Sequence, residues 1–304
     1  MSEERVDLLA LIDAAKPDLR DATRKSYYYG IKRAAPENVQ KRLGVGLSTN
    51  PVSVKWITKP AAVLKRISEL TIAVQKTTIT PLLVLTRYLF GEDSEPYKAY
   101  LSKADEYNAV VQATLSEHIK SKNQEDNWIE MDVLRDHVLR MPVDTEKQRT
   151  QKLIGALYTF QPPARNDYGQ MQIVTDLVGI SSDVNYLVCT SPGDWFFYFQ
   201  NFKTFKSKGP IIVTVSSQMK EQLLSYLDNR ELTGFLFEPP MTKGQMGYAL
   251  AQAFRKTGKH VTVNLIRHMV ASDNVDIDQV HEAVKLASDM MHSGEMQLLY
   301  AKKV

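Results

Sequence analysis

Apolar residues recur at three- and four-residue intervals through most of the first 142 residues of this 304-residue chain. This spacing gathers them on one face of an α-helix, so it predicts a series of amphipathic helices. The segments with this pattern are 8–16, 38–43, 61–76, 80–90 and 99–122. Prolines punctuate them, and Thr80-Pro81 is predicted to start a helix because proline is tolerated in the first turn. A compact helical bundle is therefore expected.

The pattern changes beyond an acidic junction that contains Pro142. A helix is expected at 146–160, followed by three β-branched or aromatic runs that predict strands at 185–190, 195–202 and 209–216. Helical patterns return, and these segments are 216–230, 244–258, 263–272 and 276–291. The predicted fold class is mainly α (α+β), with a helical domain at 1–142 and a mostly helical second domain at 143–304 that contains a small antiparallel sheet.

Composition excludes several classes of protein. No run of eighteen apolar residues is present, so no transmembrane helix is expected, and the acidic, amphipathic start does not resemble a secretory signal. Cys189 is the only cysteine, which excludes a disulfide framework and favours a reducing compartment. The sequence has no zinc-type Cys/His spacing, no P-loop, no GxGxxG and no GxSxG motif. We therefore expect no metal and no cofactor.

Charge is distributed unevenly along the chain. Residues 16–87 hold fourteen Lys or Arg against four Asp or Glu, whereas residues 88–145 hold six against twelve. The basic stretch also contains the aromatic run Ser26-Tyr-Tyr-Tyr-Gly30 and Trp56. Cations interleaved with aromatic rings are typical of a nucleic-acid surface, and a solvated helical face is the alternative interpretation.

Five places in the second domain carry polar residues that packing explains poorly. Arg165 follows a double proline, three lysines (Lys203, Lys206, Lys208) lie between the second and third predicted strands, and an amphipathic run contains Asn264, Arg267 and His268. His292 and Tyr300 follow near the end of the chain. Each residue alone has an ordinary explanation as a surface cation, a turn residue or a hydrogen-bonded core histidine.

In this order and spacing, the five places resemble the catalytic residues of the tyrosine recombinases, which cut DNA with a tyrosine. The local sequences QPPARNDY, NFKTFKSKGP and VNLIRHMVAS are similar to those of the branch found in large eukaryotic DNA viruses and mobile elements. The resemblance covers residues 145–304, and over 1–142 only the helical character is similar to the core-binding domain of the family. It implies a set of catalytic residues, which are Arg165, Lys203 (with Lys206 as the rival), Asn264, Arg267, His292 and Tyr300. Asn264 stands where the family usually has histidine, and asparagine donates hydrogen bonds but does not shuttle protons at neutral pH.

The chemistry of DNA cleavage suits these residue types. Two arginines match the charge on the non-bridging oxygens of a phosphodiester transition state, and they favour loss of the tyrosine proton. A lysine on a hairpin can protonate the leaving 5′-oxygen. A 3′-phosphotyrosine intermediate conserves the bond energy, so rejoining needs neither ATP nor metal.

The resemblance implies a site-specific recombinase or integrase whose partner is double-stranded DNA, active as a tetramer on two duplexes and independent of membranes. A non-cutting DNA-binding descendant, a type IB topoisomerase and a helical interaction module remain alternatives. The expected location is intracellular, in the nucleus or in a viral factory or virion if the source is a eukaryotic virus, and not secreted.

Overall fold

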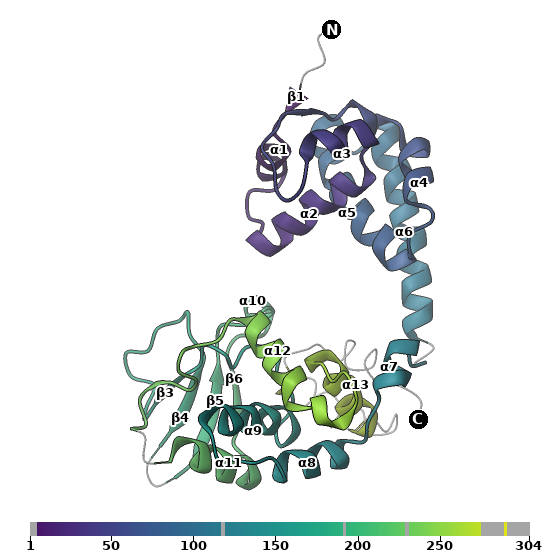
Figure 1. Cartoon of the computed structure of the whole chain (residues 1–304). Coiled ribbons are helices and arrows are strands. Elements are labelled where there is room, and N and C mark those ends of the chain that lie inside the picture. The colour runs from purple at the N-terminus through teal and green to yellow at the C-terminus, as the bar shows by residue number, and fades with distance from the viewer. Residues whose placement is uncertain (1–4, 117–118, 191–192, 229–230, 275–288, 291–304) are drawn as a thin grey trace. The chain divides into compact units, whose positions relative to one another are not determined.

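The computed structural model describes residues 5–116, 119–190, 193–228, 231–274 and 289–290. Contacts divide the chain into two compact units, Met1–Glu117 and His118–Val304. Each unit has its own hydrophobic core. Figure 1 shows the helices of the first unit and the sheet with its covering helices in the second.

The first unit is helical, as the apolar periodicity predicts. Its helices are α1 (Leu8–Ala15), α2 (Asp21–Ala34), α3 (Glu37–Leu43), α4 (Pro60–Ile67), α5 (Ile72–Phe90) and α6 (Glu95–Ser116), with the short 3-10 helix η1 (Lys55–Thr58). A two-residue antiparallel pair joins β1 (Arg5–Val6) to β2 (Val52–Ser53). The long helix α5 packs against both α2 and α6 and forms the centre of this unit.

Pro81 lies inside α5, so the predicted helix start at Thr80-Pro81 is wrong. Proline has no N–H to donate to the carbonyl of Thr77 one turn earlier, which normally weakens a helix interior. Here α2 crosses at this place through Gly30, where an added Cβ would lie 3.0 Å from Pro81 Cγ and 3.2 Å from the Thr77 oxygen. Tertiary packing at this crossing supports α5 where the local sequence predicts a boundary.

The second unit surrounds a sheet with helices. Its helices are α7 (Lys122–Asn127), α8 (Met131–Leu139), α9 (Glu146–Thr159), α10 (Phe205–Lys208), α11 (Ser217–Leu227), α12 (Lys243–Ala253), η2 (Arg255–Thr257) and α13 (Val263–Asn274). A capping box between Thr145 and Gln148 starts α9, because each side chain binds the backbone N–H of the other. This helix packs against α8, α11, α12 and α13 and is the centre of the unit.

Five strands form one sheet in the order β6-β5-β4-β3-β7. They are β3 (Gln172–Val174), β4 (Tyr186–Cys189), β5 (Trp195–Phe199), β6 (Ile211–Thr214) and β7 (Gly234–Phe235). The three predicted strands are β4, β5 and β6, which pair antiparallel. The sequence did not predict β3, which runs parallel to β4, or β7, which pairs antiparallel with β3.

The mainly α (α+β) class is confirmed. The division between the units lies earlier than the predicted boundary at 142/143, because α8 belongs to the second core, where Met131, Leu134 and Val138 are buried. Similarly, the predicted helix at 61–76 is two helices, α4 and α5. The predicted helix at 276–291 falls almost wholly outside the described residues. Within the described part of the chain, no helix combines the length and apolarity that crossing a bilayer requires.

Candidate active site

Arg165 lies in the loop that follows α9, and its backbone is held from both sides. The hydroxyl of Tyr158, at the end of α9, donates to the Arg165 carbonyl oxygen over 3.2 Å, and the backbone N–H of Asp167 donates to the same oxygen over 2.7 Å. The preceding Pro162 and Pro163 limit the backbone freedom of this loop. The position of Arg165 is therefore fixed by its own neighbours.

Arg267 reaches the same loop from α13. It is only 1% exposed, and its Nη1 donates to the backbone oxygen of Pro163 over 2.8 Å. Pro163 precedes Arg165 by two residues, so the structure brings the two predicted arginines to one short loop although they are 102 positions apart in sequence. Thr262 caps the helix by accepting from the backbone N–H of Leu265 over 3.1 Å, which fixes where α13 begins.

The guanidinium of Arg165 has an unused donor. Its Nη1 is buried and has no hydrogen-bond partner among the residues that the structure describes. A buried charged donor without a partner costs free energy, and an anion at this position would remove that cost. A phosphate oxygen has the charge and the acceptor geometry that a guanidinium prefers.

Two buried tyrosines lie beside the arginines and are poor nucleophiles. Tyr158 and Tyr168 pack edge to face, with ring centroids 5.6 Å apart. Burial raises the pKa of both phenols above the ordinary value, while the positive charge of Arg267 acts in the opposite direction at both rings. Both hydroxyls therefore stay protonated at neutral pH.

Asn264 and Arg267 lie on α13 as predicted, but their environments differ. Asn264 is exposed in the first turn of the helix, whereas Arg267 is buried. The structure thus places Asn264 at the surface, where its amide can meet a ligand from solvent.

The predicted lysines lie on the connection from β5 to β6. Lys203 is exposed and follows Phe202, which is buried and packs edge to face on Phe205 at 6.0 Å. Lys206 is exposed on the four-residue helix α10. Burial lowers the pKa of Lys208, at the end of α10, below the ordinary lysine value.

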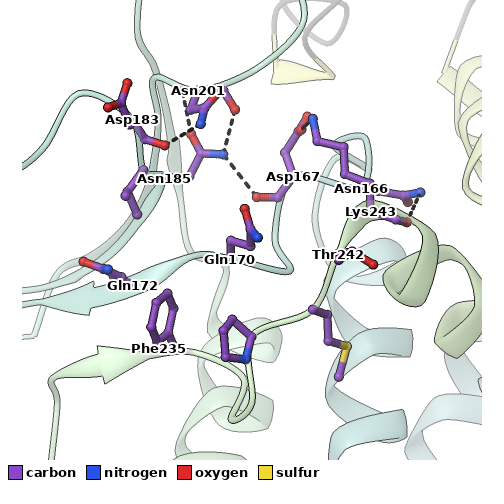
Figure 2. Close-up of a pocket in the computed structure, with 13 residues that line it drawn as sticks. Asn166, Asp167, Gln170, Gln172, Asp183, Asn185, Asn201, Phe235, Thr242 and Lys243 are labelled. Carbon is purple, nitrogen blue, oxygen red and sulfur yellow. Dashed lines mark hydrogen bonds and ion pairs between the residues drawn. The ribbon is translucent and has the colours of Figure 1, made fainter. Parts of the chain in front are cut away.

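A polar pocket of ≈ 510 Å³ lies beside the Arg165 loop, and Figure 2 shows its lining. Asp167 projects here from the loop and is paired with Lys243 at the start of α12, with 2.6 Å between Oδ1 and Nζ. Asn185, at the head of β4, lies at the centre of the hydrogen-bond network and links Asp167 to Asn201 (Figure 2). Sequence reasoning did not select Asn185, because nothing in the local pattern marks it.

His292 and Tyr300 lie outside the described residues, so the structure assigns no geometry to either. Among the described residues, no group of three or more His, Cys, Asp or Glu side chains could hold a metal ion.

The first unit presents a basic, aromatic face on α2. The run at 26–30 lies inside this helix, where Tyr28 is buried and Tyr29 is 41% exposed. Lys25 and Arg33 are also exposed and lie four residues before and after Tyr29. Residues four apart share one helical face, so Lys25, Tyr29 and Arg33 form a cationic stripe with an aromatic centre.

No protein-family model and no curated protein sequence matches this chain. Among solved structures, the chain is similar to protelomerase TelA in complex with a DNA hairpin product, with 11% identity and a TM-score of 0.47 over 99% of this chain and 96% of that one. Two more structures of protelomerase TelA, both covalently complexed with substrate DNA, match at 12% and 11% identity with TM-scores of 0.44 over the same shares of the two chains.

Proposed function

We propose that this protein breaks and rejoins double-stranded DNA through a 3′-phosphotyrosine intermediate, in the manner of a tyrosine recombinase. The observation that supports this most is the meeting of Arg165 and Arg267 at one loop, where Arg267 binds the Pro163 oxygen and Arg165 Nη1 is buried without a described partner. Each guanidinium offers planar charged donors to an anion with several oxygens, and the two arginines reach the same short loop.

In this proposal, the two guanidinium groups bind the non-bridging oxygens of the scissile phosphate and stabilise the charge that develops there. Tyr300 releases its hydroxyl proton to solvent, which the two positive charges favour, and its phenolate oxygen attacks the phosphorus, so that the phosphotyrosine bond forms as the bond to the 5′-oxygen breaks. The proton needed by that 5′-oxygen comes from a lysine of the β5–β6 connection, with Lys203 as the first candidate. Asn264 and His292 donate hydrogen bonds to phosphate oxygens.

The cationic stripe on α2 supports DNA as the partner. Lys25 and Arg33 neutralise phosphates, and the ring of Tyr29 packs against the sugar-phosphate backbone between them. Interactions of this kind give affinity without sequence information, so target choice rests on other residues.

A suicide DNA substrate tests the proposal. The duplex is nicked next to the cleavage position so that the short fragment diffuses away, and a randomised core supplies a wide range of target sequences. The protein is incubated with it without metal or ATP, and a denaturing gel separates covalent protein–DNA adducts. We expect an adduct with the wild type, none with Tyr300→Phe, and an undiminished adduct with Tyr248→Phe, because Tyr248 is an exposed tyrosine on α12, 69% accessible.

Salt-sensitive DNA binding without any adduct would contradict cleavage and favour a non-cutting DNA-binding protein. An adduct formed by Tyr300→Phe would show that another residue is the nucleophile. If the wild-type adduct forms, the number of protomers per cleaved duplex separates strand exchange, which needs four on two duplexes, from relaxation of supercoils by a monomer.

A further inference from the structure

We propose that Asn185 is a positioning residue that sets the place of the lysine-bearing connection relative to the Arg165 loop. This inference rests on the proposed cleavage activity, because it assigns Asn185 a role in delivering the proton donor. Asn185 itself touches neither arginine nor lysine through any contact that the structure describes; it acts through the backbone on both sides.

The carboxamide of Asn185 uses its full hydrogen-bonding capacity. Its Nδ2 donates to the Asp167 backbone oxygen over 3.1 Å and to the Asn201 backbone oxygen over 3.0 Å. Its Oδ1 accepts from the backbone N–H of Gln200 over 2.9 Å and of Asn201 over 2.7 Å. An amide has two donors and two acceptor positions, and all four are occupied. Figure 2 shows the bonds from the Asn185 side chain to Asp167 and Asn201.

These four bonds join two segments that carry the proposed chemistry. Asp167 lies two residues after Arg165, and Asn201 lies two residues before Lys203. Asn185 is 6% exposed, so its bonds are formed away from water, where leaving a polar group unpaired is costly. The segment is held further by the Asn201 side chain, which donates to the Asp183 backbone oxygen.

The backbone of Asn185 is itself fixed by the sheet. Its carbonyl oxygen accepts from the N–H of Gln172 at the start of β3 over 2.9 Å. One rigid amide therefore sets the spacing between the arginine loop and the lysine connection. Misplacing a proton donor by about 1 Å lowers the reaction rate by up to about 100-fold. A change in this spacing should therefore affect proton transfer from the lysine more than the affinity for DNA.

The test compares two leaving groups. The suicide substrate is prepared with the normal 5′-oxygen and with sulfur in its place, since a thiolate leaves without being protonated. Single-turnover cleavage is measured for the wild type, Lys203→Ala, Asn185→Asp and Asn185→Ala. Asn185→Asp preserves shape but places an oxygen where Nδ2 faced two carbonyl oxygens, and Asn185→Ala removes all four bonds.

We expect both Asn185 variants to cleave the oxygen substrate about 10- to 100-fold more slowly and to recover to within about threefold of the wild type on the sulfur substrate. Lys203→Ala should show the same recovery. Tyr186→Phe is the matched control, because Tyr186 is the residue next to Asn185 and begins β4. The change removes the two bonds between the Tyr186 hydroxyl and the Ser181 backbone, 3.0 and 3.2 Å long, and should slow cleavage of neither substrate.

Equal slowing of both substrates by the Asn185 variants would overturn the positioning role while leaving cleavage intact. Hydrogen exchange provides a readout that does not need activity. Asn185→Ala, which removes the acceptor of the Gln200 and Asn201 amides, should accelerate exchange of these two amides about tenfold or more relative to other strand amides. Unchanged exchange there would also overturn the inference, whereas absence of wild-type cleavage with accelerated exchange would contradict the proposed function and leave the structural link established.

Discussion

Arg267 donates from Nη1 to the backbone oxygen of Pro163, and this bond of 2.8 Å joins the middle of α13 to the loop that holds Arg165. The two arginines therefore differ in how much they contribute to the structure. Arg267 is buried and structural as well as charged, whereas Arg165 is half-buried with a donor that the described residues leave unused. The difference allows folding and chemistry to be separated by substitution.

Replacing each arginine with methionine should show this difference. Arg267→Met leaves the Pro163 oxygen without its donor, so we expect the free energy of unfolding to fall by about 1–3 kcal/mol. Arg165→Met removes a guanidinium whose Nη1 has no described bond, so stability should change by less than about 0.5 kcal/mol. Urea unfolding measures both, and the adduct assay should show no cleavage by either. A large fall in the stability of Arg165→Met would contradict this division.

A pair of glycine substitutions tests how tightly the Arg165 loop is packed. A Cβ at Gly169 would lie 2.4 Å from the backbone oxygen of Met241, whereas a Cβ at Gly244 would meet nothing within 4 Å. Gly169→Ala should therefore destabilise by about 1–3 kcal/mol, because backbone has to move. Gly244→Ala, in α12, should be neutral or stabilise by up to about 0.5–1 kcal/mol. Equal melting temperatures for the two variants would show that the loop yields without cost.

The cationic stripe on α2 predicts a change in salt dependence. Removing one cation that binds a phosphate makes the slope of log affinity against log salt shallower by about 0.9. We expect Lys25→Ala and Arg33→Ala each to reduce the slope measured by fluorescence anisotropy with duplex DNA. Lys98→Ala is the control, because Lys98, on α6, is paired with Asp93 in the turn before that helix, with 3.3 Å between Nζ and Oδ1. Slopes identical to the wild type would remove α2 from the DNA interface.

Cys189 predicts slow thiol chemistry in the folded protein. It is 3% exposed on β4, and burial raises the pKa of its thiol to about 12. At pH 8, a thiol reagent should react at least about 100-fold faster in denaturing urea than in buffer. Because the folded-state pKa is raised, the stability contributed by the neutral thiol is complete below the unfolded pKa and is lost as the pH rises toward 12. Rapid labelling in buffer would mean that the strand opens readily.

Much of the fold follows from local pattern. The strands β4, β5 and β6 are runs of β-branched and aromatic residues, so their side chains alone indicate their conformation. The strands β3 and β7 have three and two residues, too few for an alternating pattern. They form because β3 pairs with the edge of β4 and β7 then pairs with β3. Similarly, α5 continues through Pro81 because of packing from α2, which the local sequence does not encode.

Some residues of the candidate site could likewise be predicted from the sequence, and others could not. The sequence predicted Arg165 and Arg267 through resemblance and residue order, and the structure shows the physical link at Pro163. Asn185 could not be predicted, because the residues bonded to its side chain lie 15, 16 and 18 positions away and become neighbours only when the sheet forms. The roles assigned to Lys203, Asn264, His292 and Tyr300 stay predictions.

The crossing of α2 over α5 has a consequence for how the first unit could meet a duplex. Gly30 and the cationic stripe belong to the same helix, and Gly30 lies against Pro81, where an added methyl would meet atoms at 3.0 and 3.2 Å. The helix that carries the charges therefore approaches α5 most closely at Gly30. A larger side chain at Gly30 would shift α2 and move Lys25, Tyr29 and Arg33 together. We therefore expect a substitution at Gly30 to change DNA affinity although Gly30 itself is buried against α5.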